Sequence, residues 1–203
     1  AKMRNLGEAC TAANRIYVHE DVAEEFTRRL AARMSALKVG DGTDPSVDVG
    51  PLVNAETRDK VAAFVADAVA KGARIECGGQ VPDRKGFFYP PTVLSNVPET
   101  ADCIRDEIFG PVAAIQTFRD EEDVIARAND TEYGLVAYVF SENMKRALKV
   151  CERLDYGMVG LNRGLVSEPA APFGGTKQTG LGREGGHEGM LEFMETQYIS
   201  AEW

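Results

Sequence analysis

The chain has 203 residues, of which 44% are apolar and 27% are charged, and this balance excludes intrinsic disorder, collagen-like repeats and coiled coils. The net charge of -9 opposes contact with nucleic acid or with an anionic membrane surface, so we expect neither partner. No apolar run approaches the roughly 18 residues of a membrane span and the first residues lack the apolar core of a signal peptide, so we expect a cytoplasmic protein.

The first half of the chain alternates helix-like and strand-like segments. A helix is predicted over 21–37 from apolar residues at helical spacing. Its expected inner face consists of Val22, Phe26, Leu30, Met34 and Leu37. Asn54 is placed to cap a second helix, which Gly72 ends. Short β-rich runs follow at 73–77, 89–97 and 111–118.

The second half continues the alternation. A helix over 120–129 leads into an apolar strand over 133–141. Ser141 is expected to cap a further helix with Cys151 on its buried face, before an apolar strand over 158–162. Strands that are apolar on both faces and alternate with helices indicate a sheet covered by helices on both sides. We therefore predict an α/β fold, a three-layer sandwich with a largely parallel sheet.

Residues 163–189 are rich in glycine and poor in apolar side chains, which predicts a long functional loop. Its segment GLGREG, residues 180–185, has the GxGxxG spacing of a dinucleotide-binding fingerprint. The segment lacks both the preceding strand and the following βαβ unit that the fingerprint requires. We interpret it as a loop in which glycine allows close backbone approach. Residues 195–203 alternate enough to form a single last strand.

Cysteine and histidine spacing bears on disulfide and metal chemistry. The four cysteines form no CxxC pair, and neither histidine has a partner four residues away. These residues are Cys10, Cys77, Cys103, Cys151, His19 and His187. We predict neither a disulfide framework nor a metal site.

Cys10 is the candidate nucleophile. It follows Asn5, which can cap a short helix, so the thiol would lie in the first turns of that helix. There the helix dipole and unpaired N–H groups favour a thiolate and can also hold an oxyanion. From these residues alone, a buried core thiol is the alternative interpretation.

Three further side chains have a functional and a plain interpretation. Arg4 lies six residues before Cys10, where it can hold an anionic substrate group or be a solvated surface arginine. In DEIFGP, Glu107 can accept the hydroxyls of a ribose and Phe109 can pack against a flat ring. The plain alternative for DEIFGP is a turn with a buried phenylalanine.

Six segments together resemble the aldehyde dehydrogenase superfamily, in that family's order. They are NLGEACTAANR at 5–15, VGDGTDPSVDVGPL at 39–52, GFFYPPTVL at 86–94, DEIFGPVAAI at 106–115, NDTEYGLVAYVFS at 129–141 and PFGGTKQTGLGREGG at 172–186. The resemblance implies that residues 1–194 form the family's catalytic domain and that 195–203 form a strand for oligomerisation. It also implies an upstream Rossmann cofactor domain, so we expect this chain to be a piece of a longer protein.

The resemblance implies roles for the candidate residues. Cys10 matches the nucleophile, Glu107 the carboxylate on the nicotinamide ribose, and Phe109 the aromatic beside the nicotinamide ring. The asparagine that completes the oxyanion hole and the glutamate that activates water belong upstream. We therefore expect this chain alone to be inactive. The residues present are compatible with NAD and with NADP.

The substrate is implied in the same way. Phe173 matches a wall of the substrate tunnel, and Arg4 with Ser167 resembles the pair that holds the substrate carboxylate in succinate-semialdehyde dehydrogenases. This implies oxidation of succinate semialdehyde to succinate through a cysteine thiohemiacetal and thioester. Glutarate semialdehyde or another small aldehyde is the alternative, since one methylene contributes only roughly 1 to 3 kcal/mol of discrimination. The family also implies a homo-oligomer, a dimer or tetramer; a non-catalytic assembly module with Cys10 as a relic is the alternative from another class.

Overall fold

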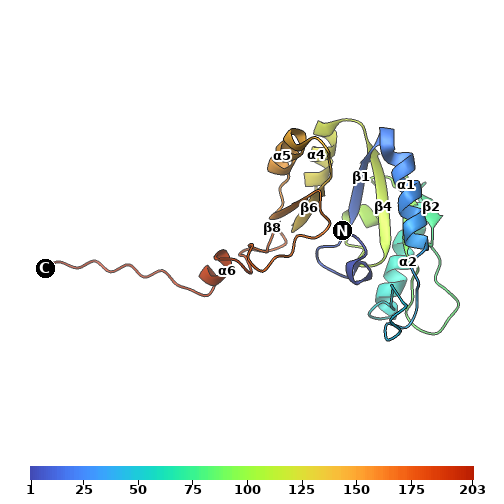
Figure 1. Cartoon of the computed structure of the whole chain (residues 1–203), viewed down its shortest axis with the longest axis horizontal. Coiled ribbons are helices and arrows are strands. Elements are labelled where there is room, and N and C mark those ends of the chain that lie inside the picture. Colours follow the sequence, from blue (N-terminus) through green and yellow to red (C-terminus); the bar gives the residue numbers. More distant parts are fainter. The chain divides into compact units, whose positions relative to one another are not determined.

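The computed structural model covers residues 1–203, and the chain divides into two compact units, Ala1–Ala128 and Asn129–Trp203 (Figure 1). No helix in it combines the length and the apolar character needed to span a bilayer. The elements of the first unit are η1 (Arg4–Gly7), β1 (Arg15–His19), α1 (Glu20–Ser35), α2 (Ala55–Ala70), β2 (Arg74–Cys77), β3 (Thr92–Ser95), α3 (Asp102–Arg105), β4 (Val112–Phe118) and α4 (Glu121–Asn129), which ends at the boundary. Those of the second unit are β5 (Tyr133–Gly134), β6 (Val136–Val139), α5 (Met144–Arg153), β7 (Met158–Leu161), β8 (Thr176–Lys177) and α6 (Glu188–Leu191).

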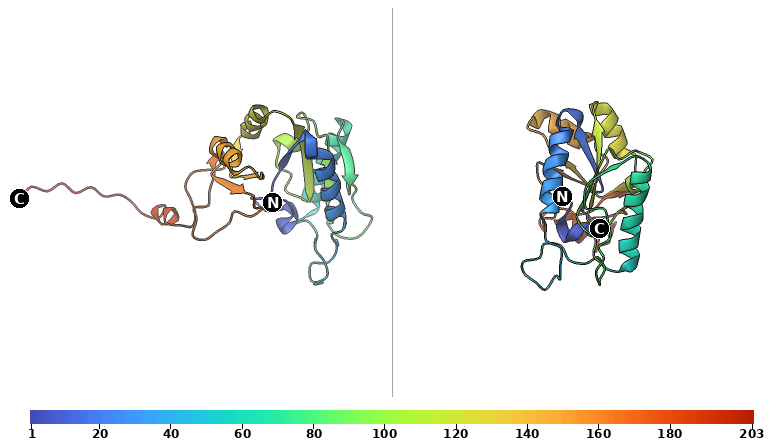
Figure 2. Two further views of the ribbon diagram at one scale, coloured as in Figure 1. Left: turned by 45° about the horizontal axis from the view of Figure 1, so that its top comes forward. Right: turned by 90° about the vertical axis from the view of Figure 1, so that its right-hand side faces the viewer.

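A four-stranded sheet in the order β1-β4-β3-β2 forms the middle of the first unit. Strands β1, β4 and β3 are parallel, and β2 is an antiparallel edge. On β4, Val112 and Ala114 pack into the core cluster of α2, whereas Ala113 and Ile115 pack into that of α1. Figure 2 shows α1 and α2 on opposite faces of the sheet. The predicted three-layer α/β sandwich with a largely parallel sheet is confirmed.

The sequence determines both ends of α2. The Oδ1 atom of Asn54 accepts a hydrogen bond from the backbone N–H of Thr57 at 2.8 Å, which is the predicted cap. At the other end Gly72 has a φ of 111°, and the N–H of Ala73 donates to the carbonyl of Ala68 at 2.9 Å. A left-handed glycine with this hydrogen bond is a Schellman motif. Both predicted ends are therefore confirmed.

The predicted inner face of α1 is correct near the end of the helix, where Met34 is buried and Leu30 packs against the same core cluster, but it is wrong in the first turns. Val22 and Phe26 are 55% and 39% exposed, whereas Ala23, Thr27 and Met34 are buried. One residue rotates a helix face by about 100°. The small side chains at 23 and 27 thus face the sheet and allow the helix to approach it closely. The helix itself is confirmed, but the assignment of Val22 and Phe26 to its inner face is wrong.

The predicted strand over 133–141 is interrupted. Its first residues form β5, antiparallel to β8, and its later residues form β6, parallel to β7. At the interruption, the N–H groups of Gly157 and Met158 donate to the carbonyls of Gly134 and Leu135 at 2.9 and 3.1 Å. One apolar run therefore serves two sheets, and hydrophobic periodicity does not reveal such a division.

Helix α5 begins later than predicted. The Oδ1 atom of Asn143 accepts from the N–H of Arg146 at 3.0 Å, and the Oγ atom of Ser141 accepts from the N–H of Asn143 at 3.1 Å. Asn143 is therefore the cap, and the assignment of that role to Ser141 is wrong. On the predicted buried face Ala147 is buried, but Cys151 is only half-buried, which corrects its placement in the core.

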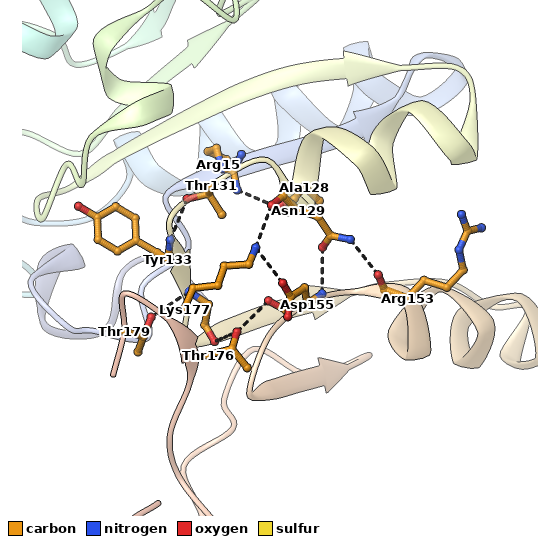
Figure 3. Close-up of polar contacts among 11 residues, drawn as sticks. Arg15, Ala128, Asn129, Thr131, Tyr133, Arg153, Asp155, Thr176, Lys177 and Thr179 are labelled. Atoms are coloured by element: carbon orange, nitrogen blue, oxygen red, sulfur yellow. Dashed lines mark hydrogen bonds and ion pairs between the residues drawn. The ribbon is translucent and has the colours of Figure 1, made fainter. Parts of the chain in front are cut away.

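Polar contacts join three segments of the second unit (Figure 3). The carboxamide of Asn129 donates to the carbonyl of Arg153 at 2.8 Å and accepts from the N–H of Asp155 at 2.9 Å. The ammonium of Lys177 donates to the carbonyl of Asn129 at 2.9 Å and pairs with the Asp155 carboxylate at 3.2 Å. These contacts anchor the middle of the 163–189 loop to the segments before β5 and β7.

Residues 195–203 form no strand in the structure. Tyr198, Ile199 and Trp203 are exposed along this segment. A strand requires hydrogen-bond partners for its backbone, and here the backbone makes no ladder. The predicted strand is thus absent from the single chain, and the oligomerisation role of the segment stays a prediction.

Candidate active site

Cys10 lies on a turn between η1 and β1. The N–H of Ala12 donates to the carbonyl of Ala9 at 2.8 Å, and Cys10 is exposed. Asn5 lies inside η1 at a φ of 44°, and its side chain donates to the carbonyl of Glu8 at 2.9 Å. The predicted capping by Asn5 and the predicted place of Cys10 in the first turns of a helix are therefore wrong. An exposed thiol on a turn is nevertheless accessible to an electrophile.

The segment before Cys10 is anchored to the core of the first unit. Leu6, at a φ of 46°, packs against the buried cluster around α2. Gly7 has a φ of 86°, and a Cβ atom there would collide with the carbonyl oxygen of Gly110. Only glycine satisfies both the left-handed backbone and this close approach. The Cys10 segment is thus in backbone contact with the segment that contains Glu107 and Phe109.

Glu107 and Phe109 lie on a segment without regular structure between α3 and β4. Ile108 between them is fully buried in the core, whereas Glu107 is exposed and Phe109 is half-buried. Phe109 has a φ of 48°, a left-handed conformation that costs a non-glycine residue energy and persists only where the surroundings enforce it. The carboxylate is therefore accessible to ribose hydroxyls, and the ring can pack against a flat ring. These two residues fit part of a nicotinamide nucleotide.

Asn14 connects the Cys10 segment to the Glu107 segment, although sequence reasoning did not single it out. Its Nδ2 atom donates to the carbonyls of Cys103 and Asp106, both at 3.0 Å. Its Oδ1 atom accepts from the N–H of Ile108 at 2.9 Å. The only sequence signal is a polar residue placed directly before a strand, because the partners lie about 90 positions further on.

Two lysines lie close to Glu107. Lys2 is buried, with 8% of its surface exposed, and its burial lowers the pKa of its ammonium to about 8 against the opposing attraction of Glu107. The Nζ atom of Lys60, on α2, donates to the backbone carbonyl of Glu107 at 3.3 Å. Two ammonium groups therefore lie near the segment that bears the carboxylate. Sequence reasoning missed both lysines.

The lowered pKa of Lys2 predicts a pH-dependent stability. Below pH 8 the folded protein buries a cation, and above about pH 10.5 the side chain is neutral in both states. Its cost of roughly 3 kcal/mol is thus complete below pH 8 and disappears as the pH rises to 10.5. We expect Lys2→Met to raise the free energy of unfolding at pH 7, and the gain to shrink between pH 8 and 10.5. Urea titrations at several pH values measure this, and a gain that is independent of pH would contradict it.

The predicted substrate residues are divided between the two units. Arg4 is exposed at the start of η1 in the first unit, and Ser167 and Phe173 are half-buried in the second. Phe173 and Glu184 exchange two backbone hydrogen bonds of 2.7 Å, which fix the PFGG segment. Pairing of Arg4 with Ser167 on one substrate carboxylate stays a prediction.

The GLGREG segment is a loop, as interpreted from sequence. It is preceded by the two-residue β8 and followed by the single-turn α6, so no βαβ unit surrounds it. Gly182 and Gly185 have φ values of 82° and 69°, and a Cβ atom at Gly185 would lie 3.0 Å from the carbonyl oxygen of Ala171. Left-handed backbone and close approach account for these glycines without a bound nucleotide.

The other three thiols differ from Cys10 in their surroundings. Cys103 is buried, which raises the pKa of its thiol to about 11. Burial also raises the pKa values of Cys77 and Cys151. A thiolate is the reactive form, so these three are poor nucleophiles.

Known proteins are similar to this chain along nearly its whole length. The sequence model of the aldehyde dehydrogenase family matches residues 1–199. A succinate-semialdehyde dehydrogenase of Paenarthrobacter nicotinovorans is 56% identical over 98% of this chain, which covers 44% of that protein. A glutarate-semialdehyde dehydrogenase of Pseudomonas putida is 45% identical over 98% of this chain, which covers 41% of that protein.

Solved structures are similar to this chain as well. The crystal structure of succinate-semialdehyde dehydrogenase from Burkholderia pseudomallei matches with a TM-score of 0.93 and 47% identity. The match covers 95% of this chain and 40% of that one. The chain thus spans about two fifths of the length of the relatives that it matches.

Proposed function

Because the chain belongs to the aldehyde dehydrogenase family, we propose that it is the catalytic part of an enzyme that oxidises succinate semialdehyde to succinate with NAD or NADP. The observation that carries the proposal is the exposed Cys10 thiol on a turn that Asn14 and Gly7 join to the Glu107 segment. A nucleophile and groups suited to a nicotinamide nucleotide thus belong to one unit. The 56% identity with a succinate-semialdehyde dehydrogenase supports the substrate.

The chemistry proceeds on Cys10. Its thiolate attacks the aldehyde carbon, so a C–S bond forms and the carbonyl oxygen becomes an oxyanion. The chemistry that NAD(P) supplies when bound is acceptance of one hydride, which is two electrons and a proton. Loss of that hydride restores the carbonyl and leaves a thioester on Cys10. Water then adds to the thioester carbon and the C–S bond breaks, which releases the carboxylate, returns the thiolate and passes the two protons of the water to solvent.

The chain's other residues orient the reactants. Glu107 accepts hydrogen bonds from ribose hydroxyls, and Phe109 packs beside the nicotinamide ring. Arg4 and Ser167 hold the distal carboxylate of the substrate, and Phe173 forms a wall of its tunnel. The Pseudomonas putida relative favours glutarate semialdehyde as a second candidate substrate, because the same anchors accept a chain one methylene longer.

The organisation of the whole protein is part of the proposal. Residues 1–194 form the catalytic domain, a Rossmann domain upstream holds most of the cofactor, and 195–203 pair with another subunit in a dimer or tetramer. The exposed Tyr198, Ile199 and Trp203 support the last point, since such side chains are buried when a partner covers them. A cytoplasmic location stays a prediction from sequence.

The proposal is tested by cofactor reduction, followed by absorbance. Succinate semialdehyde, glutarate semialdehyde and butanal are each offered to the whole protein with NAD and with NADP. We expect kcat/KM for succinate semialdehyde to exceed that for butanal by at least about tenfold, which is roughly 1.4 kcal/mol. This chain alone is expected to show no cofactor reduction. Equal kcat/KM values for butanal and succinate semialdehyde would contradict the role of Arg4 and Ser167 in binding the substrate carboxylate. If no aldehyde led to cofactor reduction, the proposal would be refuted in favour of an assembly module.

A further inference from the structure

The segment from Asp106 to Pro111 belongs to no helix or strand. At its two ends, the N–H of Asp106 donates to the carbonyl of Asp102 and the N–H of Thr92 donates to the carbonyl of Pro111, both at 2.8 Å. The segment follows the last turn of α3, where helix carbonyls have no partner within the helix, and the parallel ladder of β4 begins only at Val112. Glu107 and Phe109 lie within this gap, and the orientation of their side chains decides whether they can bind a nicotinamide nucleotide. Their direction must therefore be fixed by contacts from outside the segment.

The carboxamide of Asn14 makes hydrogen bonds to three backbone groups in and just before this segment. It accepts from the N–H of Ile108 at 2.9 Å and donates to the carbonyls of Asp106 and Cys103, both at 3.0 Å. Both the NH2 group and the oxygen of the carboxamide form hydrogen bonds, so these bonds fix the rotation of the segment as well as its position. With the Ile108 side chain buried in the core, Glu107 and Phe109 on either side of it turn away from the core.

Asn14 also lies directly on the path from Cys10 to the sheet. It lies four positions after the nucleophile, and the next residue, Arg15, pairs with Ala114 in the β1–β4 ladder. The backbone contact between Gly7 and Gly110 joins the same two segments at a second place. These contacts therefore fix the position of the turn that bears the thiol relative to the segment that bears the carboxylate.

We propose that Asn14 is a positioning residue, which holds Glu107 and Phe109 in the orientation that binds the nicotinamide half of the cofactor relative to the Cys10 thiol. The inference rests on the proposed function for the identity of the cofactor. It assigns Asn14 no contact with substrate or cofactor. Its loss should therefore weaken cofactor binding and leave the intrinsic reactivity of the thiol unchanged.

The test uses Asn14→Ala and Asn14→Asp in the whole protein. Asn14→Asp keeps the shape and the acceptor for Ile108 but loses both donated hydrogen bonds, so it decides the question if the alanine variant does not fold. Asn143→Ala is the matched control, because it removes an asparagine hydrogen bond of similar length at the α5 cap. The Kd for NAD(P)H is measured from nicotinamide fluorescence without turnover. The rate of Cys10 alkylation by iodoacetamide is measured in the absence of cofactor.

We expect both Asn14 variants to raise the Kd for NAD(P)H by at least about fivefold, as the loss of two or three hydrogen bonds implies. The KM for NAD(P) should rise with it, whereas the KM for the aldehyde and the alkylation rate stay within about twofold. A smaller rise in Kd, an equal rise in Asn143→Ala, or a parallel fall in thiol alkylation would overturn the inference.

The outcomes also separate this inference from the proposed function. Unsubstituted protein that binds NAD(P)H but oxidises no aldehyde refutes the function, and the comparison of Kd values still decides the role of Asn14. Unsubstituted protein that oxidises aldehydes while the variants keep its Kd refutes the inference alone. Absence of NAD(P)H binding by the unsubstituted protein overturns both.

Discussion

Replacing Cys10 with alanine in the whole protein is expected to lower kcat for aldehyde oxidation by at least about 10⁴-fold, because no other group can form the covalent intermediate. The thiol is exposed on its turn, so its removal disturbs no core packing. The Kd for NAD(P)H and the thermal midpoint should therefore stay close to those of the unsubstituted protein. Absorbance assays, fluorescence titration and calorimetry measure the three quantities.

Cys77→Ala and Cys151→Ala are the matched controls for Cys10. Burial raises the pKa of both thiols, so neither is expected to contribute to activity. In the unsubstituted protein, iodoacetamide should label Cys10 before the other three cysteines. A Cys10→Ala variant that kept more than about 1% of the activity would contradict the assignment. Labelling of Cys10 no faster than a model thiol would favour the assembly module, in which Cys10 is a relic.

Local features of the chain predicted the ends of α2 correctly, although they misplaced the caps at Asn5 and Ser141. Asn54 and Gly72 mark the ends of α2, because a side-chain cap and a left-handed glycine are both short-range devices. The first turns of the inner face of α1 could not be found in this way. Val22 and Phe26 are apolar but exposed, and the sheet selects the smaller Ala23 and Thr27 for close packing. The division of 133–141 between two sheets likewise depends on partners elsewhere in the chain.

The candidate site shows the same limit. Cys10, Glu107 and Phe109 were found because their segments resemble a family, and the structure joins the two segments in one unit. Asn14 carries no such signal, because its three hydrogen-bond partners are backbone groups about 90 residues further along the chain. Lys2 is unremarkable in sequence and becomes a perturbed cation only through its burial. The predicted helix at Asn5 failed because Asn5 and Leu6 adopt left-handed conformations that propensity does not anticipate.

Replacing Arg4 with alanine is expected to lower kcat/KM for succinate semialdehyde by roughly ten- to a hundredfold. A charge-assisted arginine–carboxylate contact contributes about 1.5 to 3 kcal/mol, and this contact exists only for a substrate with a distal carboxylate. The kcat/KM for butanal should therefore change by less than about threefold, which corresponds to less than roughly 0.7 kcal/mol. Steady-state kinetics with both aldehydes provides the comparison.

Arg4→Lys and Arg74→Ala distinguish this role from a general loss of charge. Lysine keeps the charge of Arg4 but not its planar fork, so the lysine variant should fall between the alanine variant and the unsubstituted protein. Arg74 is an exposed arginine on the edge strand β2, and its removal should leave both substrates unaffected. An equal loss of kcat/KM on butanal and on succinate semialdehyde would show that Arg4 supports the Cys10 turn and not the substrate. The choice between a four-carbon and a five-carbon semialdehyde would then rest on Ser167 and Phe173.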